Sequence, residues 1–277
     1  AKQCRNWLIM NTGGVMRRPG TEYKATLPAE ARVIPFIFSE DEVAIFALSN
    51  NRLDVYSSAG AVVQSNITAN CNWTTAQLFE LNYAQFGDTV FLCHRNNPIR
   101  KIVRTSATSF SVSAFAFDED DSVSAGGVNK SLQPFYKYAD SAITLTPAAT
   151  SGTGVTVTAS ANAFESDHNG TYIRIGGKQC KITGYTSATQ VAVTIIETLA
   201  GTSAEADWDE QLISAVRGYP QAVTFHDNRL WLGGVKSKPS SIIASQVGQY
   251  TNFDVESGAA THAIDVAIAG DKVNEVR

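Results

Sequence analysis

Apolar residues along this chain alternate with polar ones or occur in short runs bounded by Gly, Asn, Asp, Ser and Pro. This pattern is typical of β-strands joined by turns, because successive side chains of a strand point to opposite faces. A helical period is nearly absent, and only Ala76–Tyr83 and Glu210–Val216 are expected to form short helical turns. The pattern therefore predicts a mainly β protein.

A strand–turn–strand unit recurs along the chain. In two copies, Gly87–Ile102 and Asp227–Ile243, a first strand is followed by a polar turn and a second strand that begins near a proline. A third copy, Glu42–Tyr56, lacks the proline and turns at Asn50-Asn51, which is a strong hairpin signal. Small repeated sheets that cannot bury both faces alone stack side by side. We predict a β-propeller-like core of repeated antiparallel hairpins or blades, with one large β-sandwich as the alternative.

Between Ser141 and Leu199 the composition shifts to Thr, Ala, Gly and Val. This stretch contains four strand-like segments joined by turns, enough for a small β-barrel or β-sandwich of its own. We therefore predict an inserted domain at 141–199 between two parts of the propeller-like domain, 1–140 and 200–277, with linkers around 131–139 and 201–207. The chain stops inside a strand-like run, so we expect it to be a longer protein truncated at both ends.

Composition excludes several classes of function. A net charge of −4 argues against a protein that grips nucleic acid, because neutralising phosphates requires clustered Lys and Arg. No apolar run approaches the ~20 residues of a membrane span. The cysteines lack CxxC spacing, which predicts reduced thiols rather than a zinc site or a disulfide framework. They are Cys4, Cys71, Cys93 and Cys180.

The Gly-rich stretch GGVMRRPGTEYKA, residues 13–25, resembles a phosphate-binding loop only superficially. It lacks the GxxxxGK[ST] spacing, and an alternating strand rather than a helix is expected after it. Pro19 and Gly20 instead fit positions i+1 and i+2 of a type II turn, with Arg17 and Arg18 at its mouth. The alternative is that the arginines contact carboxylates of a partner.

No set of residues predicts catalysis, a metal site or a cofactor. The acidic run Asp118–Asp121 lacks the ligand spacing of a calcium loop, and it is expected to be a solvated loop. His226 and Asp227 are neighbours on a strand, so they are expected to point to opposite faces. Four tryptophans are expected to be core or subunit-interface anchors. They are Trp7, Trp73, Trp208 and Trp231.

Several stretches together resemble a family of tail proteins of short-tailed bacteriophages, the tail tubular or nozzle component below the portal. The matching segments are Asn6–Ile9 with GGVMRRPGTEY after it, Arg32–Ser39, Glu80–His94, Pro98–Lys101, Arg217–Gly234 and Gly248–Asp254. The predicted insert is similar to the family only in general character.

The resemblance implies a structural virion protein, not an enzyme. It implies a β-propeller protomer in a homo-oligomeric ring, a hexamer, around the channel through which DNA is ejected without specific binding. The implied partners are portal or adaptor proteins and tail fibre or spike proteins. The turn at Arg17–Gly20 and a second corner, formed by Arg217, Gly218, Tyr219 and Pro220, would set the geometry of the blades.

Two other functions stay open. A glycan- or receptor-binding tail module predicts a shallow aromatic groove on the insert, for which the sequence offers Phe164, Tyr172 and Tyr185. A polysaccharide-degrading enzyme predicts a cleft with two carboxylates, such as Asp254 and Glu256.

Overall fold

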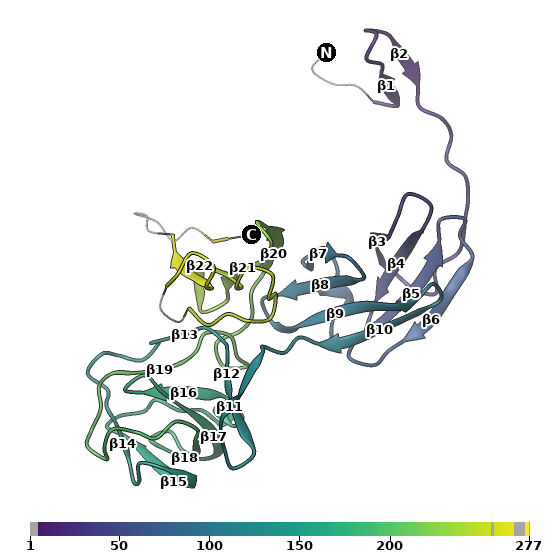
Figure 1. Cartoon of the computed structure of the whole chain (residues 1–277). Coiled ribbons are helices and arrows are strands. Elements are labelled where there is room, and N and C mark those ends of the chain that lie inside the picture. The colour runs from purple at the N-terminus through teal and green to yellow at the C-terminus, as the bar shows by residue number, and fades with distance from the viewer. Residues whose placement is uncertain (1–4, 256–257, 269–274, 277) are drawn as a thin grey trace.

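The protein is mainly β, and its strands form antiparallel sheets, as the alternation of apolar residues predicts (Figure 1). The computed structural model describes residues 5–255, 258–268 and 275–276. These residues contain no α-helix, and their helical structure is limited to the 3-10 turns η1 (Thr75–Gln77) and η2 (Ser166–His168). The helical turn expected in 76–83 is therefore one short 3-10 turn at the start of that segment.

Three four-stranded antiparallel sheets follow the order of the chain. The first contains β3 (Arg32–Ile37), β4 (Val43–Ser49), β5 (Arg52–Ser57) and β6 (Val62–Ile67). The second contains β7 (Asn82–Phe86), β8 (Thr89–His94), β9 (Asn97–Ser106) and β10 (Ser109–Ala114). The third contains β20 (Ala222–His226), β21 (Arg229–Val235), β22 (Lys238–Ala244) and β23 (Ile264–Ala267). Each predicted repeat forms the central hairpin of one sheet: β4–β5, β8–β9 or β21–β22.

The three sheets pack in series, with the second sheet in the middle. Strand β8 has a continuous apolar run, and its successive residues are buried on opposite faces. Leu92 joins a core with Phe36 of the first sheet. Phe91 joins a different core with Leu232 of the third sheet. The run in β8 is continuous because both faces of this strand are covered.

Turn residues between the strands have the backbone conformations that hairpins require. Asp227 and Asn228 join β20 to β21, and both have positive φ, 48° and 55°. Two positive φ values define a type I′ turn, which matches the right-handed twist of the flanking strands. Asn51, between β4 and β5, also has positive φ, 51°.

A seven-stranded antiparallel sheet lies between the second and third four-stranded sheets in the chain. Its order is β13 (Phe135–Tyr136), β19 (Trp208–Gln211), β16 (Tyr172–Ile175), β17 (Lys178–Ser187), β18 (Gln190–Ile195), β15 (Gly152–Ala159) and β14 (Leu145–Pro147). It has its own apolar core around Ile173 and Trp208. The hairpin β11 (Glu119–Ala125) and β12 (Val128–Ser131) precedes it.

The seven-stranded sheet differs from the predicted insert at its edges. β13 lies in the segment expected to be a linker, and β19 follows the other expected linker. The helical turn predicted for 210–216 is wrong, because Glu210 pairs with Ile173 and the strand continues to Gln211.

Three cysteines are buried in the apolar cores. Cys71, Cys93 and Cys180 are free thiols, and burial raises the pKa of Cys71 and Cys180 to about 12.

A separate hairpin, β1 (Trp7–Ile9) and β2 (Val15–Arg17), stands apart from the sheets in Figure 1. Residues 18–31 connect it to the first sheet without forming a strand.

Candidate interaction surfaces

The corner at 217–220 is a tight turn that touches two sheets. Gly218 has a φ of 80°, and its amide donates to the carbonyl of Ser214 at 2.7 Å. A Cβ at Gly218 would lie 2.5 Å from the Cβ of Lys236 and 3.1 Å from the carbonyl oxygen of Arg95. The Tyr219 amide also donates to this Arg95 carbonyl. Glycine is therefore required here both for its φ and for close approach.

A buried charged cluster ties this corner to the seven-stranded sheet. Arg217 donates two hydrogen bonds to the carboxylate of Glu210, which is 2% exposed. His168 Nε2 lies 3.0 Å from the same carboxylate, while its Nδ1 accepts the amide of Glu165. Nδ1 therefore lacks a proton and Nε2 carries it, so a neutral His168 satisfies this geometry. Tyr138 stacks on the Arg217 guanidinium at 4.6 Å. The cluster therefore connects the corner before the third sheet with β19 and η2.

The first predicted turn is not formed. Pro19 and Gly20 lie in a segment without turn or strand structure, and Gly20 does not have the positive φ that a type II turn requires. The alternating strand expected after it is also absent from the described segment 21–27. Arg17 is instead the last residue of β2, and the Arg18 amide donates to the Asn6 carbonyl at 2.9 Å.

The hairpin β1–β2 exposes every residue of both strands. Its apolar side chains are between 46% and 71% exposed: Trp7, Leu8, Ile9, Met10, Val15 and Met16. The sequence signal for this hairpin is a pair of apolar runs that flank Gly13-Gly14, a signal that the prediction of a turn at the following RRPG motif does not include. An isolated two-stranded hairpin is marginally stable in water, so these exposed apolar residues form a candidate interaction surface.

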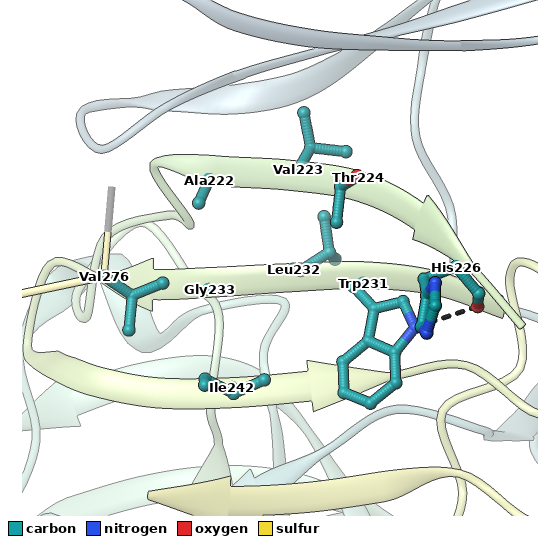
Figure 2. Close-up of a pocket in the computed structure, with 9 residues that line it drawn as sticks. All are labelled: Ala222, Val223, Thr224, His226, Trp231, Leu232, Gly233, Ile242 and Val276. Carbon is teal, nitrogen blue, oxygen red and sulfur yellow. Dashed lines mark hydrogen bonds between the residues drawn. The ribbon is translucent and has the colours of Figure 1, made fainter. Parts of the chain in front are cut away.

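The outer face of the third sheet carries an apolar pocket of about 430 Å³ (Figure 2). Ala222, Thr224, Trp231 and Ile242 come from three adjacent strands and face this pocket, with Val276 at one end. The Trp231 indole N–H donates to the His226 carbonyl at 3.0 Å, which fixes the ring at the other end of the pocket. This face lies opposite the core that contains Leu232.

The expectation that His226 and Asp227 point apart is wrong. His226 Nε2 lies 3.3 Å from the Asp227 carboxylate, because Asp227 belongs to the turn and its positive φ redirects its side chain. Both side chains are more than 70% exposed, so nothing there excludes water from a reaction. No group of three or more His, Cys, Asp or Glu side chains in the described part of the chain could hold a metal ion.

Comparison with known protein families gives a match over part of the chain. Residues 141–206 match the family model of the IPT/TIG domain. Domains of this family are Ig-like β-sandwiches, which agrees with the antiparallel strands of the seven-stranded sheet. No curated protein matches the chain.

The aromatic groove expected on the insert is not formed. Phe164 is 4% exposed and packs against Trp208 and His168, and Tyr172 is 9% exposed. Of the three, Tyr185, at 40%, is available to a ligand.

The carboxylate pair proposed for an enzyme involves Glu256, which lies outside the described residues. No helix in the described ranges is long and apolar enough to cross a membrane.

Proposed function

We propose that this chain is a structural protein of a bacteriophage tail, part of the tubular nozzle below the portal through which DNA is ejected. In this proposal the three four-stranded sheets are consecutive blades of a β-propeller. The IPT/TIG-like unit is a domain inserted between the second and third blades. The protein acts by assembling into a homo-oligomeric ring, a hexamer, and performs no reaction.

The stacking of the sheets is the observation that carries this proposal. Each sheet is a four-stranded meander, and the middle one is buried on both faces by its neighbours. Propeller blades pack in this way. The two outer faces carry exposed apolar residues, including Val33 and Ile37 on the first sheet and Val266 on the third. Such faces are expected to be covered by further blades or by neighbouring copies in an assembly.

The charge of the chain supports a conduit more than a nucleic-acid clamp. A net charge of −4 gives a mildly repelling or mixed surface. DNA slides along such a wall more easily than along a basic sleeve, because each Lys or Arg contact with a phosphate adds affinity.

The seven-stranded unit supports a role in contacts with other proteins. Two of the three aromatic residues that a glycan groove would use are buried in its interior. In this proposal its surface contacts neighbours in the tail, such as portal or adaptor proteins and fibre or spike proteins.

The test is the mass and shape of the protein with its neighbours. Light scattering and electron microscopy would be applied to the chain alone and after mixing with the portal and adaptor proteins encoded by the same genome. A closed ring that docks coaxially on the portal complex is the expected result. A protein that ignores the portal complex would contradict the proposal, and assays of glycan binding and polysaccharide cleavage would follow.

A further inference from the structure

The hairpin β1–β2 has two apolar faces, and the side chains on both faces are exposed. Cross-strand pairing places Trp7 beside Arg17 and Ile9 beside Val15 on one face. All of these side chains are exposed, and Ile9 is 71% exposed. A hairpin that pairs so regularly while exposing its apolar residues is expected to bind another surface.

Residues 18–31, which connect the hairpin to the first sheet, are held in place near Lys24. Lys24 and Leu27 line a pocket with Val33 and Ile45 on the outer face of the first sheet. A Cβ at Gly60 would lie only 2.6 Å from the Lys24 carbonyl oxygen, so the chain is tightly held there. The hairpin and its connecting segment therefore leave the body of the protein at the outer face of the first sheet.

The pocket on the third sheet lies at the opposite end of the stack. Packed sheets are about 10 Å apart, so the first and third sheets are separated by roughly 20 Å. The Arg18 amide is still bonded to the hairpin. From Arg18 to Lys24 the extended chain spans at most about 22 Å, which leaves almost no length to pass around the second sheet. A hairpin from another copy reaches this face without that detour.

Charge favours contact between the hairpin and the body of the protein, and the short connection to the first sheet makes that body the one of a second copy. Residues 1–20 contain Lys2, Arg5, Arg17 and Arg18 and no acidic residue. The remaining 18 basic and 26 acidic residues give the rest of the chain a net charge of −8. The carboxylate of Asp227 is 79% exposed at the turn beside the pocket, next to the lining residue His226. The basic hairpin and the acidic body therefore attract each other.

We propose that the β1–β2 hairpin of one copy docks on the outer face of the third sheet of a second copy. Its face with Ile9 and Val15 covers Trp231 and Ile242, and Arg17 lies near Asp227 of the second copy. The contact uses two different surfaces, so it is heterologous and can repeat around a ring. This inference rests on the proposed assembly of copies, and it names the contact that joins them.

The test measures self-association of the full chain by sedimentation equilibrium. Ile9→Asp, Arg17→Glu and Asp227→Arg are each expected to weaken association by about tenfold or more, because each places a charge or a repulsion in the contact. The double variant Arg17→Glu with Asp227→Arg is expected to recover part of the loss. Phe79→Asp is the matched control, since Phe79 is 73% exposed outside both surfaces. Thermal unfolding checks that each variant is folded.

Hydrogen exchange supplies a second measurement. Protection of β20–β22 that rises with protein concentration and is lost in Ile9→Asp supports the proposal. Protection that depends on the hairpin but not on concentration means that the hairpin docks on its own chain, which overturns it. Unchanged association of all three single variants overturns it too, while a ring that still docks on the portal complex leaves the proposed function standing. A wild-type chain that does not self-associate overturns the inference. The proposed function is then tested separately, by whether the protein docks on the portal complex.

Discussion

Arg217 and Glu210 form a two-pronged ion pair between the corner leading to the third sheet and strand β19 of the seven-stranded sheet. The Nε–Oε2 distance is 2.9 Å and the Nη2–Oε1 distance is 2.5 Å. His168, which lies 42 positions before Glu210 in the chain, approaches the same carboxylate from η2. The pair fixes how the chain passes from the seven-stranded sheet to the third four-stranded sheet.

Arg217→Gln is expected to destabilise the protein by about 3 kcal/mol, since removing one partner leaves a buried carboxylate with a neutral histidine as its remaining side-chain partner. Urea unfolding measures the free energy. The control is Lys178→Gln, because Lys178 is 50% exposed and lies 3.9 Å from Glu197. A pair of this kind contributes about 0–1 kcal/mol. Equal losses in the two variants would contradict a structural role for Arg217.

Because the second sheet packs against both of its neighbours, substitutions of adjacent residues in β8 are expected to destabilise different sheets. Leu92→Ala is expected to cost about 2–5 kcal/mol and Phe91→Ala about 3–5 kcal/mol, because both leave cavities in packed cores. Hydrogen exchange distinguishes them: Leu92→Ala should increase exchange in β4 and β5, and Phe91→Ala in β21 and β22. Ser111→Ala on the exposed face of β10 is the control. The same exchange pattern in both variants would argue against separate cores.

Gly218→Ala tests the tight corner. It combines an unfavourable positive φ with a contact at 2.5 Å to Lys236, whereas Gly177, with a φ of 75°, has open space around it. Gly177→Ala is expected to cost about 1–2 kcal/mol from backbone strain alone. Gly218→Ala is expected to cost about 1–3 kcal/mol more, because the neighbouring segment must move. Thermal unfolding of the two variants gives the difference, and a smaller loss for Gly218→Ala would refute the close approach.

Asp54 predicts a pH dependence of stability. Burial raises its pKa, but hydrogen bonds from Arg52 and from the Asn66 amide outweigh burial, so the pKa of this carboxyl is lowered overall. Its contribution to stability is therefore fully present above the ordinary carboxyl pKa of about 3.9 and is lost as pH falls through the lowered value. Asp54→Asn should have a lower urea midpoint at neutral pH. The difference from wild type should shrink on acidification, and a constant difference would contradict the assignment.

Local pattern was enough to predict much of the fold. Alternating apolar residues predict strands because a strand has two faces, and a recurring strand–turn–strand unit marked the centre of each four-stranded sheet. The Asp227-Asn228 turn has the positive φ values that its residue types favour. The composition shift at 141–199 coincides with five strands of the seven-stranded sheet, although β13 and β19 extend this sheet into and beyond the expected linkers. These signals are local, so the sequence alone carries them.

Contacts between distant segments were decided only by the tertiary structure. Pro19-Gly20 is a turn motif in sequence, but the chain there extends from the hairpin to the first sheet. The cluster of His168, Glu210 and Arg217 depends on the strand order that places β19 beside β16. The exposure of Ile9 and its neighbours could not be read from their apolar character, which normally predicts burial. By itself the sequence determined which segments form strands, because strand pattern is local; the fold alone decided which faces are covered, because coverage depends on packing between distant segments.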